Sequence, residues 1–395
     1  MTPPDANLLA PPSALPLSIS RVSTNSSTRS RSRSPALSRT HSSSSVVDAD
    51  HPKPHPPPRS SPLSLTSQAK VWRSLEQVGT WIGSWPSPAP PEPSFLRHFF
   101  TSETPSATIE LAFYVPPQYK KNIQRGRRYP VVVNLHGGGF TLGTAKDDAR
   151  WAAFVLKEVD AVVVSVEYRL APENPFPTAV EDGVEAVLHL ADNAEEYGID
   201  PKKMALSGFS AGANLCFAIP LKMQEHIHSS EYQAAAKALD NDMTDFILPE
   251  IVSIISWYPP LDMRISRAER RATSVRPDKT LPPILTGLFD QSYFHDEQSK
   301  ASPLASPSVA SDEALQTALP NDIALFLCEW DMLMKEGLAF SARLKKLGKN
   351  VHEVLIERKP HAFDKCPNPF HVDPKVALHY GQACELLRDA FKAGT

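Results

Sequence analysis

The chain has 395 residues, 41% of them hydrophobic, which is enough for one large α/β domain or two small ones with a substantial core. A formal net charge of −3 gives no electrostatic basis for nucleic acid as the main partner. No apolar run reaches 18 residues, so a membrane-spanning helix is not expected. The cysteines show no metal-ligand spacing, so we interpret them as reduced structural thiols and predict no metal site: Cys216, Cys328, Cys366 and Cys384.

Residues 1–65 are dominated by proline, serine and arginine, as in "STNSSTRSRSRSPALSRTHSSSS". Such a segment buries too little apolar surface to offset the entropy of ordering, which predicts a disordered tail. The run "RSRSRSP" fits a phosphorylation or docking segment as well as a plain solvated one. The N-terminus has no basic n-region and is interrupted by prolines, so we expect no secretory signal; its arginine and serine content only partly fits a transit peptide. Cytoplasmic location is the default.

The segment 66–93 carries a helical pattern. Apolar residues recur on one side and polar residues on the other: Val71, Trp72, Leu75, Val78 and Ile82 against Lys70, Arg73, Glu76 and Gln77. The pattern predicts an amphipathic helix that needs an apolar surface. Because its polar side carries only two basic residues, we expect it to pack on the protein's own body; contact with a membrane surface is the alternative.

Beyond residue 94, strand-like and helix-like runs alternate. The expected strands are 108–115, 128–137, 161–170, 202–208, 251–259, 322–330 and 351–357, with helices between them, such as 177–198 and 333–348. Several strands are near-continuous aliphatic runs, which are typical of parallel strands buried on both faces. The alternation predicts a mostly parallel, doubly wound α/β sheet, whose sites gather beyond the carboxyl ends of the strands.

Ser210 stands at one of these ends, within "GFSAG" (208–212). A serine on a tight strand–turn–helix bend has its hydroxyl pushed into the open, and its neighbours must be small to avoid collisions. The alternative is an ordinary glycine-rich turn. A nucleophilic serine would need a base, a group that orients the base, and donors for an oxyanion.

The sequence offers candidates for each. "HGGGF" (136–140) places three glycines after a strand, where backbone N–H groups can turn toward an acyl oxygen. A phosphate cradle is the alternative, but no Gly-x-x-x-x-Gly-Lys follows. We expect His136 to have a structural role.

Asp331 follows the strand 322–330, and His361 follows the next strand. Taken singly, Asp331 could be a helix cap and His361 a surface histidine. Together with Ser210 they follow the chain order Ser, Asp, His, which is that of α/β-hydrolase triads.

Several motifs then occur in order over residues 95–392: "HGGGF" (136–140), "VEYRLAPENPFPTAVEDGVEAV" (166–187), "GFSAGANL" (208–215), "SPLASP" (302–307), "CEWDML" (328–333) and "PHAF" (360–363). They resemble the hormone-sensitive-lipase family of α/β-hydrolases, the HGGG esterases and lipases. The resemblance implies an α/β-hydrolase domain over 66–395. Its helical cap would comprise 66–93 and lid insertions at about 222–248 and 263–299.

The resemblance also implies site residues: Ser210 as nucleophile, His361 as general base and acid, and Asp331 as the group that orients His361. It assigns the oxyanion donors to the backbone of Gly138, Gly139 and Ala211, with Gly137 shaping the turn, and it implies no cofactor. We expect a small-molecule partner, a carboxylic ester of small to medium chain length. The expected pocket is apolar: Trp85, Phe140, Phe209, Trp257 and Tyr258.

Lipase, amidase and lactonase chemistry use the same machinery and stay open, as does a non-catalytic receptor, although the presence of His361 counts against the last. Two features depart from the family. Phe209 stands where many relatives have an acidic residue, and the segment "DMRISRAERRATSVRPDK" is longer and more basic than a compact lid requires. The oligomeric state is not indicated.

Overall fold

The computed structural model describes residues 60–84, 90–102, 107–227, 248–365 and 373–393. Most of the predicted tail, together with Trp85 and Cys366, lies outside these ranges. The other three cysteines are buried free thiols. Among the described residues, no helix is both long and apolar enough to cross a bilayer.

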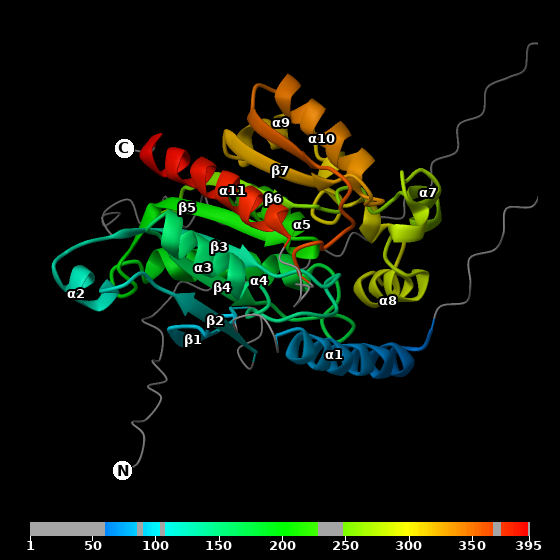
Figure 1. Ribbon diagram of the computed structural model, residues 1–395, viewed down its shortest axis with the longest axis horizontal. Helices are drawn as coiled ribbons and strands as arrows, with labels where there is room; N and C mark the ends of the chain where they lie inside the picture. Colours follow the sequence, from blue (N-terminus) through cyan, green and yellow to red (C-terminus); the bar gives the residue numbers. More distant parts are fainter. Residues whose placement is uncertain (1–59, 85–89, 103–106, 228–247, 366–372, 394–395) are drawn as a thin grey trace, which may run out of the picture.

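One sheet of eight strands forms the centre of the molecule (Figure 1). Its strands are β1 (Phe95–Phe100), β2 (Thr108–Tyr114), β3 (Tyr129–Leu135), β4 (Val162–Glu167), β5 (Ile199–Phe209), β6 (Ile251–Trp257), β7 (Asp322–Cys328) and β8 (Asn350–Ile356). They lie in the order β1-β2-β4-β3-β5-β6-β7-β8. The pairs β1–β2 and β2–β4 are antiparallel, and all later neighbours are parallel. The predicted doubly wound sheet is therefore confirmed.

Helices cover both faces of this sheet. Because successive strand residues point to opposite faces, each central strand contributes to two separate cores. One core includes α4 (Thr178–Asp192), α5 (Ala211–Ile227), α9 (Asp312–Ala318) and α10 (Met334–Lys346), and the other includes α3 (Ala149–Glu158) and α11 (Pro374–Ala393). A short helix, α2 (Tyr119–Gln124), precedes β3.

The aliphatic runs become the central strands because they are buried on both faces. In β3, all but one of the residues are fully buried, and Val132 pairs with Val163 of β4 and with Ala205 of β5. The edge strand β1, "FLRHFF", was not among the expected strands. Most of its side chains are exposed, so its sequence lacks the continuous apolar run of a central strand.

A cap lies beyond the carboxyl ends of the strands. It comprises α1 (Pro62–Ser84), α7 (Arg267–Ala272), a 3₁₀ turn at Pro277–Lys279 and α8 (Pro283–Tyr293), and α1 lies beside α8 (Figure 1). The second expected lid segment, 263–299, contains α7, the 3₁₀ turn and α8. The first, 222–248, does not begin as a lid. Residues 222–227 are the end of α5, about 18–25 Å along the helix from Ser210, and 228–247 lie outside the described residues.

Helix α1 forms where the periodicity predicts it and packs beside α8, but its contact face is rotated from the expected stripe, of which Trp72 is half-buried. Val71 and Leu75 of the expected buried stripe are 58% and 55% exposed, whereas Leu65 and Ala69 are buried. The prediction of the packing face was wrong because polar side chains of α1 satisfy backbone groups of the protein body, as described below.

Candidate active site

Ser210 lies on a sharp turn between β5 and α5, in the left-handed region of backbone conformation with φ of 52°. That conformation costs a non-glycine residue about 1–3 kcal/mol. A Cβ on Gly208 would lie 2.3 Å from the carbonyl oxygen of Gly212, and one on Gly212 would lie 1.9 Å from that of Leu135. Only glycine fits on either side, as the collision argument predicts.

Three side chains that are far apart in sequence meet at this turn. The Nε2 atom of His361 lies 2.8 Å from the Oγ atom of Ser210, and its Nδ1 atom lies 2.5 Å from Oδ2 of Asp331. The side chains of His361 and Asp331 are 5% and 2% exposed. Each residue follows its own parallel strand, and parallel strands end at the same edge, so the topology brings the three together.

Asp331 contacts both the imidazole of His361 and a backbone group just before α10, whose N-cap is Leu333. Its Oδ1 atom accepts a hydrogen bond from the backbone N–H of Leu333, at the start of α10, at 3.1 Å. This bond holds the carboxylate in place while Oδ2 contacts the imidazole. The nearby Glu329 has a different partner, because its carboxylate accepts the N–H of Arg358.

The segment 136–143, here called the glycine loop, lies directly beside Ser210. A Cβ on Gly137 would lie 3.6 Å from the Cβ atom of Ser210. Gly138, Gly139, Phe140 and Gly143 all have positive φ, so the loop winds in a way that favours glycine. Gly139 and Ala211 both line the pocket in front of Ser210.

His136 has the structural role that we expected. Its ring is fully buried and stacks on Tyr168 with 4.1 Å between ring centres, and its Nδ1 atom contacts the carbonyl oxygen of Gly137.

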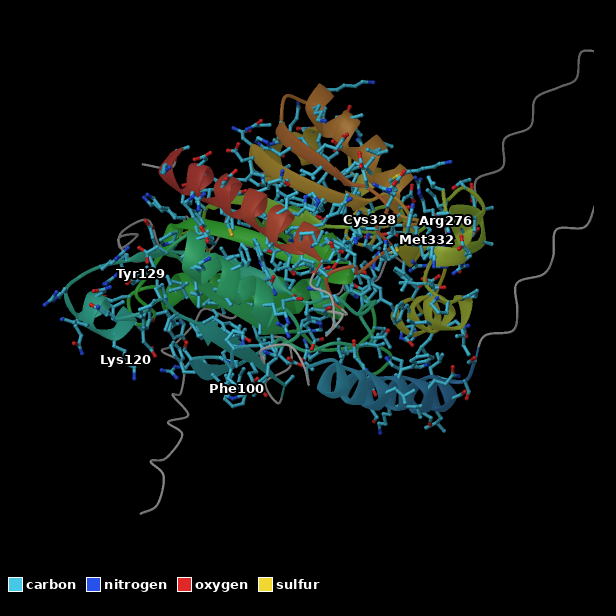
Figure 2. All side chains as sticks on the ribbon, viewed as in Figure 1. Phe100, Lys120, Tyr129, Arg276, Cys328 and Met332 are labelled. Atoms are coloured by element: carbon cyan, nitrogen blue, oxygen red, sulfur yellow. The ribbon has the colours of Figure 1, made fainter. Side chains whose placement is uncertain are left out.

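The pocket over Ser210 has a volume of about 420 Å³, its open mouth included, and is mainly apolar. Its walls come from the ends of the core and from the cap: Phe140, Pro260, Met263, Leu281, Phe289, Tyr293, Phe294, Met332 and Leu333. In Figure 2, Met332 lies at the same end of the molecule as α7 and α8, whereas Lys120 lies at the opposite end. One ion pair interrupts the apolar lining, because Arg267 donates to Asp290 at 2.8 Å.

Only one of the described side chains that we expected in the pocket lines it, namely Phe140. Phe209 and Trp257 are fully buried and stack on each other, with 5.5 Å between ring centres, within the core that contains α3 and α11. The strand alternation turns them beneath the nucleophile instead of toward the substrate side. Tyr258 is also buried; its ring packs edge-on against His361, with 4.7 Å between ring centres.

Behind the triad lies a buried charge network, which the sequence reading missed. The ammonium of Lys365 lies 2.5 Å from Oδ1 of Asp148 and 3.2 Å from Oδ2 of Asp364. Asp364 also accepts the hydroxyl hydrogens of Tyr258 and Tyr380, each at 2.6 Å. Burial by itself lowers the pKa of Lys365, but the two carboxylates more than offset that effect and leave the pKa raised. The lysine therefore stays protonated at neutral pH.

The cap residues in the pocket were also missed, because no motif marks them. The basic segment that departs from the family belongs to this cap, and its arginines are paired within the chain. Arg270 forms a buried ion pair with Glu336, with 2.7 Å between Nε and Oε2 and a hydrogen bond of 3.1 Å from Nη2 to Oε1. Arg264 pairs with Asp262 at 2.7 Å on the surface. The segment thus has a structural explanation that needs no anionic partner.

Comparisons with known proteins agree with this architecture. An arylesterase from Saccharolobus solfataricus is 31% identical over 291 residues, which cover 73% of this chain and 84% of that protein. The AB hydrolase superfamily protein C1039.03 from Schizosaccharomyces pombe is 28% identical over 242 residues, 61% of this chain and 63% of its own length. The solved esterase from Pyrobaculum calidifontis aligns with a TM-score of 0.64 at 26% identity, covering 83% of this chain and 98% of that one.

A family model described as alpha/beta hydrolase fold matches residues 132–365, more than half of the chain. This range contains the glycine loop, Ser210, Asp331 and His361. The chain belongs to the α/β-hydrolase fold family, in its hormone-sensitive-lipase-like branch.

Proposed function

We propose that this protein is a serine hydrolase that cleaves carboxylic esters with a small to medium apolar acyl or aryl part. The observation that carries the proposal is the hydrogen-bonded series Ser210–His361–Asp331 at the floor of an apolar pocket. The arylesterase and esterase names of the similar proteins support the choice of ester over other bonds.

In the proposed reaction, His361 accepts the hydroxyl proton of Ser210 at Nε2 as Oγ attacks the ester carbonyl carbon. Asp331 orients the imidazole through Nδ1 and stabilises its charged form. The carbonyl oxygen becomes an oxyanion, and the backbone N–H groups of Gly138, Gly139 and Ala211 are the proposed donors to it. His361 then gives the proton to the leaving alcohol oxygen as the C–O bond breaks. Water repeats the sequence on the acyl-enzyme, releasing the acid and restoring the serine.

The buried position of His361 and Asp331 supports this mechanism. Electrostatic interactions are stronger where water is excluded, so the carboxylate has a larger effect on the imidazolium than it would at the surface. The mainly apolar lining of the pocket supports a substrate with an apolar acyl or aryl part.

The test is hydrolysis of a p-nitrophenyl ester series, from acetate to palmitate, by the wild-type protein and Ser210→Ala. We expect turnover that is greatest with short to medium chains and that falls by a factor on the order of 10⁴ to 10⁶ in the variant. Ser207→Ala is the matched control, because Ser207 lies on the same strand, buried and away from the pocket.

Two outcomes would overturn the proposal. One is Ser210→Ala retaining more than about one tenth of the activity, since a nucleophile cannot be lost at so small a cost. The other is faster turnover of long-chain triglyceride emulsions than of dissolved esters, which would favour a lipase. Reaction with a fluorophosphonate probe separates an activated serine from an idle one when no ester in the series is cleaved.

A further inference from the structure

Two polar side chains of α1, which the helical pattern places on an outward face, are turned inward onto the glycine loop. Arg73 donates from Nε to the carbonyl oxygen of Thr141 at 2.8 Å. Glu76 accepts the backbone N–H of Gly143 at 3.1 Å through Oε2. The apolar side chains Val71 and Leu75 of the same helix remain exposed. Among the described side chains of α1, Val71 and Leu75 are thus left in water, while Arg73 and Glu76 contact the loop.

Arg73 also contacts the segment 171–173, which lies against the other side of the glycine loop. Its Nη2 atom donates to the carbonyl oxygen of Ala171 at 2.8 Å, and the guanidinium pairs with Glu173 at 3.0 Å. The N–H of Ala171 in turn donates to the carbonyl oxygen of Phe140, at 2.8 Å. One guanidinium therefore links α1, the glycine loop and the segment 171–173.

The glycine loop needs such external contacts. Four of its residues have positive φ, and its internal hydrogen bonds are few, chiefly those from the N–H groups of Thr141 and Leu142 to the carbonyl of Gly138. The contacts from Arg73 and Glu76 fall on Thr141 and Gly143, two and four residues after the proposed donor Gly139. A shift of about 1 Å in a reacting group can cost on the order of 100-fold in rate, so restraint at these positions matters for catalysis.

We propose that Arg73 and Glu76 are positioning residues that hold the oxyanion donors of the glycine loop in place, so that α1 is part of the catalytic machinery. The proposal rests on the proposed ester hydrolysis. It assigns a role to a helix that precedes the range matched by the family model, 132–365. The donors need to be held most accurately when charge develops on the substrate oxygen, so loss of these contacts acts on the transition state more than on substrate binding.

The first experiment compares Arg73→Met with Lys70→Met. Arg73→Met keeps the aliphatic stem and removes the donors to Thr141 and Ala171, whereas Lys70 is exposed on the same helix. We expect kcat for a short p-nitrophenyl ester to fall about 10- to 100-fold in Arg73→Met, with KM changed less than about threefold. Lys70→Met should match the wild type in both constants.

The second readout is affinity for a boronic acid, which bonds to the serine oxygen and mimics the tetrahedral intermediate. In Arg73→Met and Glu76→Ala, the inhibition constant should rise by about the same factor as kcat/KM falls, because both report on the oxyanion site. Glu76→Gln keeps an acceptor oxygen for Gly143 and should recover activity that Glu76→Ala loses. Thermal unfolding of each variant identifies an assay temperature at which all of them are folded.

A purely structural role for α1 gives a different result: the unfolding midpoint falls, while kcat and boronate affinity of the folded variants stay at the wild-type values. That result overturns the inference and leaves ester hydrolysis intact. A wild-type protein without any ester turnover or fluorophosphonate labelling instead counts against the proposed function itself.

Discussion

The ammonium of Lys365 lies 3.1 Å from the centre of the Phe209 ring, directly beneath the residue that precedes Ser210. The attraction between a cation and an aromatic face strengthens as the pair is removed from water; here the Phe209 ring is fully buried and the Lys365 side chain is 24% exposed. Relatives that carry an acidic residue at this position place a charge beside the nucleophile. In this chain, Phe209 is uncharged, and the charged groups lie on the other side of its ring from Ser210: Asp148, Asp364 and Lys365.

We predict that Lys365→Met destabilises the protein by about 3–5 kcal/mol, because it leaves two buried carboxylates without their counter-charge. Urea unfolding at pH 7 measures the effect. Lys146→Met is the control, since Lys146 pairs with Glu92 on the surface at 3.0 Å and such pairs contribute about 0–1 kcal/mol. Equal effects of the two substitutions would show that the buried network does not stabilise the fold.

Gly212→Ala is expected to prevent the native turn from forming. Its Cβ atom would meet the backbone oxygen of Leu135 at 1.9 Å, and neither backbone can move without displacing a central strand. We expect little folded protein and no turnover. The control, Gly381→Ala in α11, has no atom within 4 Å of the new Cβ and should gain about 0.5–1 kcal/mol from helix propensity. Folded and active Gly212→Ala protein would contradict the described packing.

In the arginine-rich part of the cap, substitutions at neighbouring positions should differ sharply in their effect on the free energy of unfolding. Arg270→Met removes the partner of the buried Glu336 and should cost about 3–5 kcal/mol. Arg264→Met affects an exposed pair and should change the free energy of unfolding by less than about 0.5 kcal/mol. Thermal unfolding of the two variants checks this difference; similar melting temperatures would mean that the cap is not anchored through Arg270.

The pH dependence of stability should report on His189. Burial lowers its pKa to about 4, and its ring stacks on Phe99 with 4.3 Å between ring centres. An unfolded histidine titrates near 6.5, so the folded protein resists protonation that the unfolded chain accepts. The stabilisation is complete above about pH 6.5 and is lost as the pH falls toward 4.

The loss from His189 should amount to about 2–3 kcal/mol, measured as the change in free energy of unfolding between pH 7 and pH 4. His189→Gln has no group that titrates in this window, so its stability should fall by that much less over the same interval. Other titrating groups affect both proteins alike. Parallel pH profiles would show that His189 is protonated as readily in the folded state.

Sequence patterns predicted which residues meet at the strand ends, because each motif marks a strand end, and parallel strands end together. The order Ser210, Asp331, His361 was enough to place three residues that the fold brings within hydrogen-bonding distance. The same reasoning failed for Phe209 and Trp257, which flank strand ends but point into the core. Aromatic character alone does not tell which face of the sheet a side chain occupies.

Helix α1 shows a second limit of prediction from the sequence. Its periodicity predicts a helix, yet the half-buried Arg73 and Glu76, expected on the polar side, contact the glycine loop. The decisive partners are backbone groups of a loop about 70 residues away, and backbone groups leave no trace in the sequence. Pocket residues such as Met263 and Phe289 escaped for a related reason, since only the packing of the cap brings them over Ser210.

The close contact of Gly212 with Leu135 also indicates that the surroundings of Ser210 tolerate mutation less than the pocket walls do. Around the nucleophile, backbone touches backbone, so a single added methyl group is excluded and the positions are closed to evolutionary change. The pocket walls from α7, α8 and their flanking segments are side chains, which can be exchanged one at a time without moving that backbone. New substrate preferences can therefore arise in the cap while the reaction chemistry is inherited unaltered.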